Sequence, residues 1–291
     1  MEQRVTESPQ RRAWRVTEPI HAMIYFAPEA PSRYGALGIG PQDGYFASRA
    51  AAFGACGPGV VAATFYNFNP DLVARALPAA WEVTTPEAMI AARLSAVDAA
   101  LTRGLGADVL ASAAVVEAAE LARKAAESAT AWPYGRPLFA AHAELPWPDE
   151  PHLVLWHAQT LLREFRGDGH VATLVAAGIS GIEALVLHVA TGQTDERFLR
   201  VSRGWRREAW AEAVDALRSR GLLDVDGAFT DAGRSLRAEV EAATDRLAQP
   251  AYDALGEAGC ERLAELTRPL SRTLVKVGML NPRLPGAQEA A

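Results

Sequence analysis

The chain has 291 residues, of which 49% are hydrophobic and 22% charged, a composition that is typical of a folded globular protein and excludes a disordered or fibrous one. The formal net charge of -6 argues against a surface covered with basic side chains, so contact with nucleic acid would need a local basic patch. The two cysteines are too few for a disulfide framework. Without a signal peptide or an apolar run of about 18 residues, the protein is expected to be cytoplasmic and to make no membrane contact.

The spacing of apolar residues predicts a mainly α-helical protein. Apolar side chains recur with the helical period in ten segments, which are 43–54, 57–67, 70–77, 86–103, 107–130, 151–166, 170–177, 180–190, 206–220 and 231–268. Thr85, Pro86 and Glu87 form a typical helix start, with a capping hydroxyl, a proline at the first helical position and an acid in the first turn. The last segment is expected to break near Pro250, because proline removes a helical hydrogen bond.

A proline-rich segment predicts a boundary between two domains. Residues 132–151 read WPYGRPLFAAHAELPWPDEP, and five prolines in this segment exclude one continuous helix. We therefore expect an N-terminal lobe over residues 19–145 and a C-terminal lobe over residues 150–282.

The two halves of the chain also resemble each other, which indicates an internal duplication. Asp43-Gly44 matches Asp168-Gly169 at an offset of 125 residues, and Trp81 matches Trp205 at an offset of 124. Val116-Glu117-Ala118-Ala119 matches Val240-Glu241-Ala242-Ala243 at 124, and Arg103-Gly104-Leu105 matches Arg220-Gly221-Leu222 at 117. One chain would then hold two copies of a helical module as a pseudo-dimer. The alternative is two unrelated helical domains.

The second lobe has the element order of a winged helix. A helix over 180–190 precedes one that opens at Arg203-Gly204-Trp205 and ends at Gly221. Asp226-Gly227 between apolar residues is typical of a tight hairpin, and Thr230 can cap the long helix that follows. We expect a short β wing here, whereas the first lobe has proline and alanine at that place and is expected to be degenerate.

The run AVDALRSRGLLDVDGAFTDAGRSLRAEVEAATDRLA resembles the winged-helix end of MarR-type regulators. Together, LLREFRGDGHVATLVAAG, RGWRREAW and TDAGRSLRAEVEAATDRLA resemble more closely an actinobacterial family described as helix-turn-helix. The specific part of this resemblance covers residues 150–250, and DGYFASRAAAFG in the first half belongs to it as well. The resemblance implies a MarR-like fold, whose dimers present two recognition helices to successive major grooves. It implies no catalytic role.

The candidate DNA-binding residues are four arginines at the start of the expected recognition helix: Arg200, Arg203, Arg206 and Arg207. Base and phosphate contacts are normally made at this place. From residue 195 to residue 237, however, nine arginines face eight acids, which leaves a charge of only +1. Because phosphate contacts supply most of the affinity for DNA, this balance is unfavourable. The alternative is a fold kept for packing or ligand binding, with arginines that pair with local acids.

The candidate ligand site is the polar cluster over residues 163–170, at an expected junction between two helices. Its candidate residues, with two tyrosines of the first lobe, are Tyr45, Tyr66, Arg163, Glu164, Arg166, Asp168 and His170. His170 with Glu164 could form an acid/base pair, and the aromatic run 65–68 could line an apolar pocket for a small aromatic or polyketide-like ligand. The alternative is structural: Asp168 caps the next helix and the arginines form surface ion pairs.

These observations favour a MarR-like regulator or small-molecule sensor with a ligand pocket between the lobes, whose partner is duplex DNA. The alternative is a ligand-sequestering protein or enzyme that does not bind DNA and uses Glu164, Asp168 and His170. We expect no metal, because His152 and His157 are five residues apart rather than three or four, and no cofactor. Whether the chain is a monomeric pseudo-dimer or a homodimer stays open.

Overall fold

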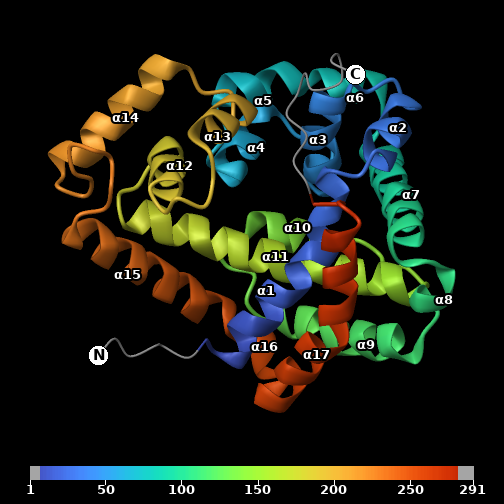
Figure 1. Ribbon diagram of the computed structural model, residues 1–291. Coiled ribbons are helices and arrows are strands. Elements are labelled where there is room, and N and C mark those ends of the chain that lie inside the picture. The colour runs from blue at the N-terminus through green and yellow to red at the C-terminus, as the bar shows by residue number, and fades with distance from the viewer. Residues whose placement is uncertain (1–6, 281–291) are drawn as a thin grey trace.

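The computed structural model describes residues 7–280, which fold into α-helices joined by short connections (Figure 1). The mainly α class is confirmed. The α-helices are α1 (Pro9–Ala22), α2 (Glu29–Gly35), α3 (Pro41–Ala50), α4 (Pro58–Phe65), α5 (Pro70–Ala76), α6 (Ala79–Val83), α7 (Pro86–Leu105), α8 (Ala107–Leu110), α9 (Ala113–Ala129), α10 (Pro137–Ala143), α11 (Pro151–Ala176), α12 (Gly181–Val189), α13 (Glu196–Ser202), α14 (Arg207–Ser219), α15 (Asp231–Ala248), α16 (Pro250–Asp253) and α17 (Gly256–Lys276). Two 3-10 helices, η1 (Met23–Tyr25) and η2 (Ala51–Phe53), follow α1 and α3.

The larger of two hydrophobic cores joins both ends of the chain. Helix α1 packs along α17, and α9 packs along α11. Helix α9 can lie close to its neighbours because its buried face consists almost entirely of alanine. At the contact of α1 with α17, Ser271 Oγ donates a hydrogen bond of 2.6 Å to the carbonyl of Val16. The core therefore includes residues from both sides of the proline-rich segment.

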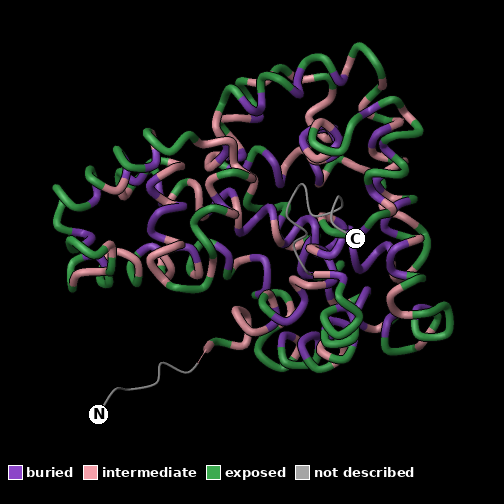
Figure 2. The backbone as a smooth tube through the Cα atoms, turned by 45° about the horizontal axis from the view of Figure 1, so that its top comes forward, coloured by how far each residue is buried: buried purple, intermediate pink, exposed green. Residues whose placement is uncertain are grey.

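The smaller core lies within the helix-turn-helix and the helix after it. Leu185, Trp210, Leu217 and Val240 bring together α12, α14 and α15. Helix α11 contributes to both cores, since Leu153 to Phe165 belong to the first and Leu174 to the second. The two cores thus divide within α11 and not at residues 145–150, where the prolines predicted a boundary. Figure 2 shows buried segments inside both groups of helices and exposed ones along their outer rims.

Helices α12, α13 and α14 form the helix-turn-helix, and each local signal agrees with it. Ser180 and Glu183 cap the start of α12 reciprocally, and the Asp195 side chain accepts the N–H of Phe198 at the start of α13. Gly204 lies in the turn with φ of +74°, a conformation that favours glycine. Helix α14 buries Trp210 and Leu217 and exposes most of its opposite face.

The expected β wing is wrong for the described residues, because 7–280 contain no strand and only one isolated antiparallel bridge, between Leu223 and Phe229. Side chains take the place of a strand ladder. The Asp224 carboxylate accepts the N–H groups of Asp226 and Ala228, both at 2.9 Å. The Arg218 guanidinium donates to the carbonyls of Asp224 and Val225. These local bonds satisfy the backbone without a second pair of residues in register.

The first half repeats the order of the second half without its open face. Helices α4, α5, α7 and α9 occur in the order of α12, α13, α14 and α15, with the short α6 inserted between α5 and α7 and the short α8 where the second half has the bridge. Ser112 and Thr230 cap α9 and α15 and are 118 residues apart, so the Val116–Val240 match at 124 does not align these helices. Within residues 7–280, two complete winged helices are therefore not observed.

The difference between α7 and α14 lies in what surrounds them. Helix α7 packs against α2, α3, α11 and α17, whereas α14 packs chiefly against α12 (Figure 1). Over residues 7–280, no single helix is long and apolar enough to cross a membrane; α11 and α12, bent by 100°, pass that test only as a pair.

Candidate functional site

The polar cluster over residues 163–170 lies in the middle of α11, a continuous helix of 26 residues. The expected junction at Gly167 and Gly169 is therefore wrong. Gly169 serves close packing: a Cβ there would lie 2.9 Å from Nη1 of Arg136 and 3.2 Å from Cβ of Leu247. The glycine leaves room for a guanidinium against the helix, and the hydrogen bonds of α11 continue through it.

Asp168 caps a helix, but not the one that the sequence indicated. Its Oδ2 accepts the N–H of Phe139 at 2.9 Å, in the first turn of α10. Burial raises the pKa of Asp168 to about 7, against the effect of that hydrogen bond. Arg136, beside it, donates to the carbonyls of Phe165 and Leu247 and stacks on the Phe165 ring. Asp168 and Arg136 together fasten α10 to α11.

Glu164 is the acidic half of a buried ion pair. Arg49 of α3 lies 3.2 Å from its Oε1, and both side chains are almost inaccessible. Although burial opposes ionisation, Arg49 and Arg163 lower the pKa of Glu164 to about 2. The Arg49 guanidinium also donates to the hydroxyl of Tyr45 at 3.0 Å and lies 4.2 Å from the centre of the Phe65 ring. The Glu164 carboxylate is thus ionised, and its charge is paired with that of Arg49.

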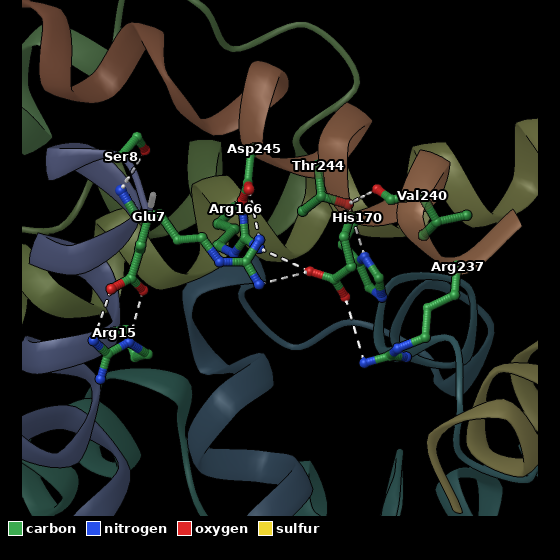
Figure 3. Close-up of polar contacts among 11 residues, drawn as sticks. Glu7, Ser8, Arg15, Arg166, His170, Arg237, Val240, Thr244 and Asp245 are labelled. Carbon is green, nitrogen blue, oxygen red and sulfur yellow. Dashed lines mark hydrogen bonds and ion pairs between the residues drawn. The ribbon is translucent and has the colours of Figure 1, made fainter. Parts of the chain in front are cut away.

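His170 contacts α15 rather than Glu164. Its Nδ1 lies 2.9 Å from the Thr244 hydroxyl (Figure 3), and burial lowers the pKa of its imidazole, so the neutral form dominates near pH 7. Arg166 of α11 lies 2.8 Å from Asp245, which is also on α15 (Figure 3). The expected acid/base pair of His170 with Glu164 does not form, because the two side chains engage different helices.

A cleft of about 370 Å³ lies between the two groups of helices and brings most of the predicted ligand residues together. Its wall includes Tyr45, Arg163, Glu164, Arg166, Asp168 and His170. The aromatic run contributes Phe65 and Phe68, as its sequence suggested. Tyr66 is the exception: it lines an adjoining hollow, and its hydroxyl donates to the carbonyl of Ile179.

Arg49 and Trp14 also line the cleft and were missed, because each comes from a helix far from the polar cluster in sequence. Arg49 lies six residues after Asp43-Gly44, the pair that matches Asp168-Gly169. The Asp-Gly repeat was the available sequence signal for Arg49, but it did not indicate an ion pair with Glu164.

Arg203, one of the predicted DNA-binding residues, also lines the cleft. Its guanidinium lies 4.6 Å from the centre of the Phe68 ring, and its Nη1 donates to the Ser202 hydroxyl. Burial lowers the pKa of this guanidinium. No carboxylate of the described chain lies within ion-pair distance of it. Arg203 is turned inward because it ends α13, where the turn meets the first half of the chain.

Residues 66–69 form direct hydrogen bonds with the turn between α13 and α14. The N–H of Asn69 donates to the carbonyl of Arg203 at 2.9 Å, and its side-chain amide donates to the carbonyl of Gly204 at 3.1 Å. In the other direction, Trp205 Nε1 donates to the carbonyl of Asn67 at 2.9 Å. The segment that supplies Phe68 to the cleft therefore also positions the turn between α13 and α14.

The outer face of the helix-turn-helix carries the remaining predicted arginines. Arg206 and Arg207 are exposed at the start of α14 and make no ion pair within residues 7–280. Arg200 lines a shallow groove between α13 and α14 and lies 3.6 Å from Glu196. The same groove includes Asp195 and Asp215, so its charge is mixed. Over the described residues, no group of three or more histidine, cysteine or acidic side chains has the geometry of a metal site.

A family model described as a helix-turn-helix family matches residues 10–281 of the chain, nearly its full length. The match includes both halves, so the helices before the helix-turn-helix are part of what defines the family. Neither the curated proteins nor the solved structures include a match. The comparisons therefore agree with the helix-turn-helix and indicate a DNA-binding regulator at a coarse level.

Proposed function

The chain belongs to this helix-turn-helix family, and on that premise we propose that it is a MarR-like transcriptional regulator that binds duplex DNA and senses a small molecule in the cleft. Helix α14 would enter the major groove, with Arg206 and Arg207 on phosphates and base edges. The exposure of both guanidinium groups at the start of α14 supports this contact.

The DNA complex is proposed to contain two chains. Of α14 and its counterpart α7, only α14 has an open outer face in the described structure, since α7 packs against α2, α3, α11 and α17. One chain then reads one half-site, and a site with two half-sites requires a homodimer. The monomeric pseudo-dimer would leave its second recognition helix covered.

The ligand is proposed to be a small aromatic molecule of the polyketide-like kind that carries an acidic group. Phe65, Phe68 and Tyr45 offer ring faces in the cleft. Arg203 offers a guanidinium without a carboxylate partner in the described chain, suited to an acidic group on the ligand. In contrast, Arg49, Arg163 and Arg166 already pair with Glu164, Glu18 and Asp245.

The observation that carries the sensor proposal is the double role of the turn at Arg203 and Gly204. The Arg203 side chain faces the cleft, while the carbonyl groups of Arg203 and Gly204 accept hydrogen bonds from Asn69. Helix α14 starts three residues after Gly204. A ligand that draws the Arg203 guanidinium toward itself would favour one position of α14 over another. Such a preference is what couples ligand binding to DNA binding.

A fluorescence anisotropy titration with a pool of random duplexes, followed by selection of bound sequences, tests DNA binding. The double variant Arg206→Ala with Arg207→Ala should weaken binding about tenfold. Arg33→Ala with Arg75→Ala is the matched control, because both arginines are exposed and lie on α2 and α5. Equal loss in both double variants, or no binding by the native chain at low salt, would contradict the proposal.

A ligand-binding protein or enzyme that does not bind DNA is the second candidate. The observation that favours it is Asp168, which lines the cleft with a pKa of about 7, as a general acid or base requires. If a reaction is found, His170→Ala and Asp168→Asn should each reduce kcat. The DNA titration separates the two candidates, since only the regulator binds duplex with an affinity that falls with salt.

A further inference from the structure

A second cavity, of about 100 Å³, lies at the edge of the first core and shares no wall residue with the cleft. It is bordered by α3, η2, α7, α10, α11 and the segment between α10 and α11. Most of its wall is apolar, with Ala52, Ile90, Leu94 and Pro146 among the contributing side chains. Nothing in the proposed regulatory function uses this cavity.

Arg93 brings a positive charge into the wall of this cavity. The residue is 5% exposed, its Nη1 donates to the carbonyl of Ser48 at 3.1 Å, and its guanidinium lies 5.1 Å from the Trp156 ring. Its Nη2 is buried without a hydrogen-bond partner, and no carboxylate of residues 7–280 pairs with it. A buried charge without a counterion is strongly unfavourable, so an anion bound beside Arg93 would be stabilised.

Two histidines add hydrogen-bonding capacity but no charge. His142 and His157 are buried in the same wall, and burial lowers the pKa of each to about 4. His157 Nε2 is also buried without a partner, while His142 Nδ1 lies 2.9 Å from the carbonyl of Leu138. Near pH 7 the wall therefore holds one positive charge, on Arg93, and neutral imidazoles.

We propose that this cavity binds a short aliphatic monocarboxylate, of the acetate and propionate class, with its carboxylate on Arg93 and its carbon chain against Ile90 and Leu94. One guanidinium matches one carboxylate in charge and shape. Phosphate or sulfate would bring a second charge and more acceptors than an apolar wall can satisfy. The small volume leaves no room for an aromatic acid.

Isothermal titration with sodium propionate at constant ionic strength tests the proposal on the full chain. We expect one propionate per chain and at least tenfold weaker binding by Arg93→Met. Arg123→Met is the matched control: Arg123 stacks on Trp147, 4.6 Å from the ring centre, but does not line the cavity. The control should bind propionate as the native chain does, and an equal loss in both variants would overturn the proposal.

A second variant keeps the test decisive if Arg93→Met does not fold. Ala52 lies at the cavity wall on η2, so Ala52→Leu should fill the space, leave Arg93 in place and weaken propionate binding at least tenfold. Hexanoate and benzoate should bind the native chain at least tenfold more weakly than propionate. Unchanged binding by Ala52→Leu, no binding by the folded native chain, or a crystal grown with propionate that holds only water at Arg93 would each overturn the proposal.

Discussion

The arginines of the cleft and those of the helix-turn-helix face have opposite surroundings. In the cleft, Arg49 is almost inaccessible, pairs with Glu164 and stacks on an aromatic ring. On the face, Arg206 and Arg207 are exposed and unpaired within the described residues. Arg203 precedes Arg206 by three positions, yet it belongs to the first group. Position in the turn, and not residue type, decides whether a guanidinium can meet DNA.

The difference between buried and exposed arginines also limits how much of the net charge of +1 between residues 195 and 237 can contact DNA. Arg203 is turned inward, and Arg218, Arg220 and Arg234 pair with Asp215, Glu183 and Asp231. Few arginines are left for phosphates, so we expect a shallow dependence of DNA affinity on salt. The following predictions test this contrast, from the largest expected effect to the smallest.

Glu164→Gln should destabilise the protein by about 3 to 5 kcal/mol, because it leaves the buried Arg49 charge without its partner. Asp215→Asn, which breaks the exposed pair with Arg218, should change the free energy of unfolding by about 0.5 kcal/mol or less. Urea unfolding at pH 7 measures both. Equal effects would show that the two groups of arginines do not differ in this way.

Asp168→Asn should change how stability depends on pH. Because the folded pKa of Asp168 is about 7, above its ordinary 3.8, the folded state holds a proton that the unfolded state releases between these values. Its contribution therefore favours folding at low pH and is lost as pH rises toward 7, by at most about 1.4 kcal/mol per pH unit.

Asparagine keeps an oxygen that can accept the Phe139 N–H but has no such proton. The native free energy of unfolding minus that of Asp168→Asn should thus decrease from pH 4 to pH 7, as urea unfolding at four pH values can measure. Parallel curves would contradict the raised pKa.

The double variant Arg206→Ala with Arg207→Ala should lower the slope of log affinity against log salt by up to about 2, since each phosphate contact contributes about 0.9. Anisotropy titrations at several salt concentrations measure this slope. A steep slope that survives in the double variant would place the DNA contact elsewhere on the chain.

Arg203→Met should leave DNA affinity in the absence of ligand within about twofold of the native value, because its guanidinium faces the cleft. If a ligand is identified, its effect on DNA affinity should be lost in the same variant. A large loss of DNA binding without ligand would return Arg203 to the DNA-contacting group.

The sequence predicted α7 and α15 with their caps, Thr85 and Thr230, because capping acts locally. It missed α1 and α13, which lie outside every predicted segment. It also identified six residues of the cleft wall, five of them on α11, because charged residues on that helix need partners. It failed where distant contacts override local signals. The two glycines in α11 suggested a break, but the reason for Gly169 is Arg136, more than thirty positions earlier. The direction of Arg203 likewise depends on Asn69, which no nearby residue indicates.

Helix α11 runs from one hydrophobic core into the other without interruption. Unfolding of either core would remove packing contacts from α11, on which the other core also depends. We therefore expect that neither core unfolds independently of the other. Calorimetry of the full chain should accordingly record a single heat-absorption peak, with equal van't Hoff and calorimetric enthalpies. A chain cut at the proline-rich segment would lose this shared helix from the first core and should not yield two independently folded pieces.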